Sequence, residues 1–116
     1  MNAQSLVECR FLVPLHRDKS ISDGGLHPVT AWNWLHAELW EWFHGRTNSR
    51  IAIYEGVWKD EKGEPVYDTS REYIVALPQD EVDDLRKLLV KACTVFFQRC
   101  FYLSVKGDVE FPGPNC

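Results

Sequence analysis

Residues 51–77 read I-A-I-Y-E-G-V-W-K-D-E-K-G-E-P-V-Y-D-T-S-R-E-Y-I-V-A-L and contain the pattern that decides the fold. Two runs rich in aromatic and β-branched residues, 51–59 and 66–77, flank a polar segment that holds Gly63 and Pro65. Glycine and proline are typical of the turn between paired strands, so this stretch predicts a β-hairpin. The other elements can be placed around it.

A strand and a helix are predicted before the hairpin, and a helix and a strand after it. Residues 6–15 alternate between apolar and polar side chains, which is typical of a half-buried strand. Helical periodicity covers 30–44 and 79–98, and a last strand covers 101–106. This order predicts an α+β, ferredoxin-like split βαβ sandwich in one domain over 1–116, a four-stranded antiparallel sheet with two helices on one face.

Size and charge exclude several classes of function. The chain has 116 residues, of which 45% are apolar, and a net charge of −4 without a basic run, so nucleic-acid binding is not expected. The first ten residues lack the features of a signal peptide, and no stretch approaches the roughly 20 apolar residues that span a bilayer. We therefore expect a cytoplasmic protein that does not bind a membrane.

The four cysteines, Cys9, Cys93, Cys100 and Cys116, form no C-x-x-C pair and have no regular spacing with histidine. This spacing predicts free thiols, with Cys9 and Cys93 on core faces as small apolar side chains. No metal site and no cofactor are predicted.

The predicted helix over 30–44 holds four of the five tryptophans. Its core stripe is predicted to contain Ala31, Leu35, Leu39, Trp42 and Phe43, with Trp32 beside it. Trp34 and Trp40 point away from this stripe on opposite sides. Either loops and tails cover these two indoles, or they contact a partner or a small molecule, because tryptophan is enriched in interfaces.

The longest predicted loop, 16–28, carries His16, His27 and the run Asp23-Gly24-Gly25 ahead of the helix. Backbone N–H groups at a helix start attract anions, so a phosphate or carboxylate site is one interpretation. A transition-metal site at the two histidines with Asp18 or Asp23 is another, and an ordinary surface loop is the third.

The hairpin places charged and aromatic side chains on adjacent strands. Glu55 facing Arg71 or Ser70 would be ordinary cross-strand pairing. A cleft with Glu55 or Asp68 as general base, beside Tyr54 or Tyr73 as acid, is the chemical alternative.

The hairpin also resembles that of small uncharacterised bacterial proteins of ferredoxin-like type, which carry a Gly-x-Trp, a turn glycine and an acid-x-Ser. Here those positions are Gly56, Trp58, Gly63, Asp68 and Ser70. The likeness covers about 20 residues. It implies the fold but no activity.

Because both helices are expected on one face of the sheet, the other face needs a cover, and a homodimer through it or through an edge strand is expected. The sequence therefore favours a non-enzymatic binding or regulatory module that recognises a protein or a small anionic ligand. The expected contact residues are Trp34, Trp40, Trp58, Arg71, Asp23, Gly24 and Gly25. The alternative is a small dimeric enzyme that uses acid–base chemistry, with candidate residues His16, His27, Glu55, Asp68 and Tyr54. An enzyme should gather His16 or His27 with Glu55 or Asp68 around one pocket.

Overall fold

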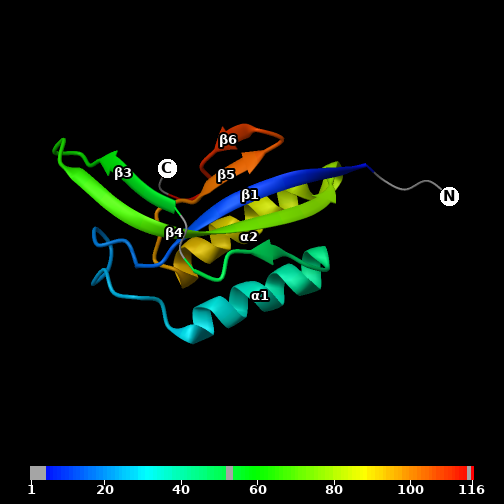
Figure 1. Cartoon of the computed structure of the whole chain (residues 1–116), viewed down its shortest axis with the longest axis horizontal. Coiled ribbons are helices and arrows are strands. Elements are labelled where there is room, and N and C mark those ends of the chain that lie inside the picture. Colours follow the sequence, from blue (N-terminus) through cyan, green and yellow to red (C-terminus); the bar gives the residue numbers. More distant parts are fainter. Residues whose placement is uncertain (1–4, 52–53, 115) are drawn as a thin grey trace.

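The computed structural model describes residues 5–51, 54–114 and 116, and it contains one antiparallel sheet and two α-helices (Figure 1). The strands are β1 (Leu6–Pro14), β2 (Thr47–Asn48), β3 (Tyr54–Lys59), β4 (Pro65–Pro78), β5 (Tyr102–Val105) and β6 (Asp108–Glu110). The helices are α1 (Val29–Phe43) and α2 (Val82–Val95), with a short 3-10 turn, η1 (Gln79–Glu81), before α2. Residues 52–53, part of the predicted strand 51–59, lie outside the described residues.

The sheet is built around the long pair of β1 and β4. Its order is β2-β4-β1-β5-β6, and β3 also pairs with β4. The register of β1 and β4 runs without a break from Leu6 opposite Pro78 to Pro14 opposite Ser70. The part of β4 that precedes Ser70 in the sequence pairs with β3 and no longer with β1. The β3–β4 hairpin therefore extends beyond the end of β1 (Figure 1).

The prediction of an α+β antiparallel fold with two helices is confirmed, but the number of strands is wrong. The sheet has six strands rather than four. The two extra strands are β2, which has two residues, and β6, which has three and follows a tight turn at Gly107 (φ +87°). Strands this short carry no readable alternation, so sequence periodicity could not find them.

The core lies between one face of the sheet and both helices. Alternate residues of β1 and β4 are buried, and α1 contributes a stripe spaced by four residues. The largest fully buried side chains include Tyr73, Phe11, Phe96, Phe101 and Leu35. The helices therefore cover the same sheet face, and residues such as Arg10, Glu72 and Ile74 lie on the other.

The tryptophans of α1 only partly follow the prediction. Trp40, for which the sequence left open a cover of loops and tails or contact with a partner, is 66% exposed. Trp42 is 56% exposed, and the prediction that it joins the core is wrong. Trp42 lies in the last helical turn and donates its indole N–H to Glu38 at 2.9 Å instead of packing on the sheet. Trp32 and Trp34 are partly buried against the core.

The C-terminal tail folds back on the segment between α2 and β5. Phe101 donates its backbone N–H to Pro112 O at 3.0 Å, and Cys100 and Cys116 form a disulfide. The prediction of free thiols is therefore wrong for these two residues, because their pairing depends on the returning tail and not on sequence spacing. It is correct for Cys9 and Cys93, which are buried and free.

Candidate functional site

An open pocket of about 350 Å³ lies where β1 leaves the edge of β4. The residues that line it come from β3, from β4 and from the start of the loop after β1, and they are His16, Glu55, Gly56, Tyr67, Asp68 and Thr69. Three of the five catalytic candidates, His16, Glu55 and Asp68, therefore meet around one pocket. This is the arrangement expected of an enzyme. Their chemical role stays a prediction.

Strand pairing brings these side chains together. Gly56 lies opposite Asp68 and Glu55 lies opposite Thr69 in the hairpin. Leu15 donates its backbone N–H to Thr69 O at 2.9 Å, and this bond carries the next residue, His16, to the same edge. A Cβ at position 56 would lie 2.6 Å from Asp68 Oδ1, so glycine leaves the space that the Asp68 carboxylate occupies.

The lining is acidic. It holds the carboxylates of Glu55 and Asp68, the His16 imidazole and two hydroxyl groups, and its lining residues include no lysine or arginine. Tyr67 is 76% exposed and presents an aromatic ring at the rim. Carboxylates with an aromatic face are suited to a cationic ligand that also has apolar parts.

The other two catalytic candidates lie elsewhere. His27 is buried, with Nε2 at 2.7 Å from Pro14 O, and burial lowers the pKa of this imidazole. Tyr54 donates its hydroxyl to Glu72 at 3.1 Å, and this hydrogen bond raises the pKa of Tyr54. Neither residue lines the pocket.

In the loop before α1, groups that could donate hydrogen bonds to a bound anion already donate them to the carboxylate of Asp23. Arg17 donates two hydrogen bonds to the Asp23 carboxylate, both of 3.0 Å, and Gly25 N–H donates to the same group at 2.9 Å. These bonds lower the pKa of Asp23, first through Gly25 and then through Arg17. Asp23 and Gly25 thus form a local network with Arg17, while Gly24 donates its backbone N–H to Ser22 Oγ at 3.2 Å.

Of the predicted contact residues on the helix and the hairpin, Trp40 and Trp58 are exposed at separate places on α1 and β3, and Trp34 is partly buried. Arg71 lies on β4 with its guanidinium carbon 4.3 Å from the centroid of the Trp32 ring. The sequence did not single out Tyr67 or Thr69 as site residues. Both start from the face of β4 opposite to Asp68, because successive residues of a strand point to opposite faces.

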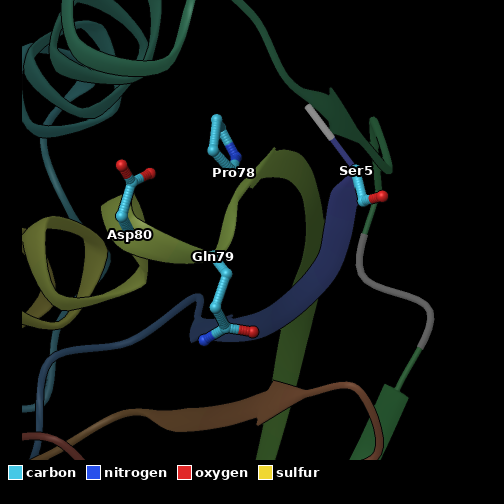
Figure 2. A pocket seen from close by; sticks show the side chains of 4 residues that line it. All are labelled: Ser5, Pro78, Gln79 and Asp80. Carbon is cyan, nitrogen blue, oxygen red and sulfur yellow. The ribbon is translucent and has the colours of Figure 1, made fainter. Parts of the chain in front are cut away.

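A second hollow, of about 340 Å³, is lined by Ser5, Pro78, Gln79 and Asp80. Figure 2 shows Ser5, just before β1, across from Pro78 at the end of β4 and from Gln79 and Asp80 of η1. This second hollow is lined by one carboxylate, that of Asp80, and by none of the residues predicted to be catalytic or binding. It therefore has fewer groups that could take part in a reaction than the pocket at the hairpin.

In the part of the chain that the structure describes, no group of three or more His, Cys, Asp or Glu side chains is placed to hold a metal ion. No helix there combines the length and the apolar character that crossing a membrane requires.

The sequence matches no protein-family model and no curated protein. The fold is similar to a solved structure, a phage SAM lyase in complex with S-methyl-5′-thioadenosine. The match has a TM-score of 0.66 and 14% identity, and it covers 95% of this chain and 88% of the other. At this identity the likeness shows a shared fold.

This finding corrects the function favoured by the sequence. The protein that shares the fold is an enzyme, which contradicts the non-enzymatic binding module. The alternative, a small α+β enzyme, agrees better with the comparison.

Proposed function

We propose that this chain is an enzyme that binds S-adenosylmethionine and cleaves a carbon–sulfur bond to release S-methyl-5′-thioadenosine. The observation that carries the proposal is the pocket in which Glu55, Asp68 and His16 converge. It lies in a fold shared with a phage lyase that was solved with that thioether bound. The split βαβ strand order β3-β4-β1-β5, which we assign to the ferredoxin-like type, is consistent with the proposal.

The charge of the pocket suits this substrate. S-adenosylmethionine carries a positive sulfonium, and a carboxylate about 4 Å away attracts a unit charge by roughly 1 to 4 kcal/mol between bulk water and a protein surface. Glu55 and Asp68 both line the pocket, but their side chains start from opposite faces of the hairpin, so each contributes to this attraction according to its distance from the sulfonium. The adenine and ribose can lie against the exposed ring of Tyr67.

The same charge argument separates binding from catalysis. When the carbon–sulfur bond breaks, its electron pair stays on sulfur and the sulfonium becomes a neutral thioether. The carbon chain that leaves sulfur loses a proton from the adjacent carbon and becomes an alkene, and His16 and Glu55, which line the pocket, are the groups proposed to accept that proton. The attraction by Glu55 and Asp68 is therefore strongest in the substrate and is lost in the product. It holds the substrate and assists product release, but it does not lower the barrier, which depends on interactions that strengthen in the transition state.

The test is release of S-methyl-5′-thioadenosine from S-adenosylmethionine, measured by liquid chromatography and corrected for spontaneous breakdown. We expect turnover by the wild type and a KM raised about tenfold or more in Glu55→Gln and Asp68→Asn, since each removes one charge from the pocket. Glu41→Gln and Asp84→Asn are matched controls on the exposed surfaces of α1 and α2. Absence of turnover and of binding in the wild type would refute the proposal.

A cytoplasmic location, predicted from the sequence, suits a metabolite substrate. In a reducing cytosol the Cys100–Cys116 disulfide would be open, because such compartments keep thiols reduced. The assay should therefore be run with and without reductant.

A further inference from the structure

Arg71 is a partly buried cation held in a fixed orientation. Its guanidinium carbon lies 4.3 Å from the centroid of the Trp32 ring, which is the geometry of a cation–π contact. Its Nε is buried and has no hydrogen-bond partner among the described residues. Tyr73 is a polar neighbour of this guanidinium: burial raises the pKa of the Tyr73 hydroxyl, and a hydrogen bond from Arg71 opposes that rise. A guanidinium has five N–H groups, so donors remain for a further acceptor.

The surroundings of Arg71 are short of negative charge. Within the described residues, no carboxylate lies within 4 Å of Arg71, Arg46 or Arg50, whereas Arg10, Arg17, Arg86 and Arg99 each have such a partner. All Asp and Glu residues of the chain lie within the described ranges, so a carboxylate that pairs with Arg71 has to come from outside the chain.

Other polar groups gather beside Arg71, between α1 and β4. His36 Nε2 lies 2.7 Å from the Tyr73 hydroxyl. Arg46 donates to Asn48, which pairs with Tyr73 in the sheet. Burial lowers the pKa of His36, and the positive charges of Arg46 and Arg71 lower it further. The cluster thus holds a neutral imidazole and two guanidinium groups, a net positive environment.

This positive cluster lies next to the acidic pocket. Thr69 lines the pocket, and Arg71 lies two residues further along β4 on the same face, about 7 Å away in an extended strand. The face is set by the unbroken register with β1, in which Val13 opposes Arg71.

We propose that Arg71, oriented by Trp32, binds the carboxylate of the substrate while Glu55, which opposes Thr69 on the same face of the sheet, holds its sulfonium. This inference rests on the proposed function. In S-adenosylmethionine three carbon atoms separate the carboxyl group from sulfur, so the two charges of the substrate match the two charged regions along β4. The arrangement selects a sulfonium that carries a carboxylate over one that lacks it.

Binding of three ligands tests the inference by isothermal titration. S-adenosylmethionine has both charges, decarboxylated S-adenosylmethionine keeps the sulfonium, and S-methyl-5′-thioadenosine has neither. Because a hydrogen-bonded guanidinium–carboxylate pair is among the stronger polar contacts, the wild type should bind S-adenosylmethionine about 10- to 100-fold more tightly than the decarboxylated form. Arg71→Gln should abolish this preference and leave the Kd of the other two ligands unchanged.

Arg71→Lys should retain part of the preference, since it keeps the charge and loses the planar fork. This variant also serves if Arg71→Gln does not fold. Arg10→Gln is the matched control, because Arg10 lies on the opposite face of the sheet. It should behave as the wild type.

The outcomes separate the two proposals. If the wild type binds S-methyl-5′-thioadenosine but Arg71→Gln keeps the preference for the carboxylate, the inference is wrong and the proposed function stands. If the wild type binds none of the three ligands, both fail. Tight binding of inorganic phosphate that depends on Arg71, without any preference for the carboxylated substrate, would show a general anion site and would also overturn the inference.

Discussion

Opening the Cys100–Cys116 disulfide should lower the stability of the folded chain by a predictable amount. The bond joins residues separated by 16 positions and attaches the tail to the segment before β5. The substitution Cys116→Ser removes it at the chain end, where the side chain is exposed and packing changes little. The change therefore acts on the cross-link itself.

The expected magnitude follows from the length of the closed loop. A cross-link across about 15 residues removes conformational entropy from the unfolded chain worth about 3 kcal/mol. For a chain of 116 residues, unfolding entropy near the midpoint is roughly 0.24 kcal/mol per kelvin, so this loss lowers Tm by about 12 °C. In the folded state the tail keeps its hydrogen bond from Phe101 N–H to Pro112 O, so local fraying should be limited.

Thermal and urea unfolding, followed by circular dichroism with and without dithiothreitol, measure the effect. The reductant should bring the wild type down to the Cys116→Ser midpoint and leave the variant unchanged. Equal midpoints for the wild type and Cys116→Ser in the absence of reductant would refute the reasoning. A reductant effect of the same size on the variant would also refute it. The first result would show that the tail is held by its non-covalent contacts alone.

Three further predictions concern the pocket, the buried histidine and the open face of the sheet. Gly56→Ala should raise the KM for S-adenosylmethionine at least severalfold, because the added Cβ would lie 2.6 Å from Asp68 Oδ1 and displace this flexible carboxylate. The free energy of unfolding should change by less than about 1 kcal/mol. The neighbouring exposed Val57→Ala is the control, and an unchanged KM in Gly56→Ala would contradict the placement of Asp68. Burial lowers the pKa of His27 in the folded state, so the unfolded chain binds the proton more readily and the free energy of unfolding should fall as the pH drops below about 6.5. Urea unfolding at pH 7.5 and 5.5 should show a smaller loss of stability in His27→Gln than in the wild type, and identical losses would exclude His27 as the cause of the pH dependence. The homodimer expected from the open sheet face should sediment as more than one chain at micromolar concentration and dissociate in Ile74→Lys, whereas a wild type that is monomeric throughout would contradict it.

The long elements could be predicted from the sequence because each carries a repeated pattern. Strand β1 was expected over 6–15 and occupies Leu6–Pro14, and α1 was expected over 30–44 and occupies Val29–Phe43. Alternation over nine residues and a helical stripe over four turns outweigh local exceptions. The short strands β2 and β6 and the disulfide depend on where distant segments meet, and no local pattern encodes that.

The site was predictable only in part, for a similar reason. His16, Glu55 and Asp68 were found as chemical types, and the pairing of the hairpin with the end of β1 brings them together. His27 has the same chemical type as His16, but its ring is enclosed by Trp32 and Phe96, with centroids at 5.6 and 4.8 Å. Sequence spacing cannot distinguish a histidine that faces a pocket from one that faces the core.

The tryptophan-rich helix shows how burial and function can be combined in one residue. From the sequence, Trp34 and Trp40 lie off the core stripe and were expected either to be covered by loops and tails or to contact a partner or a small molecule, whereas Trp32 was explained by packing alone. In the folded chain Trp32 packs at the edge of the core and presents its face to Arg71. A guanidinium fixed on an indole loses less side-chain freedom when it binds a carboxylate than a free arginine does. Replacing Trp32 with leucine, which keeps apolar bulk but removes the π face, should therefore weaken binding of S-adenosylmethionine more than binding of its decarboxylated form, and equal weakening of both would show that Trp32 acts through packing only.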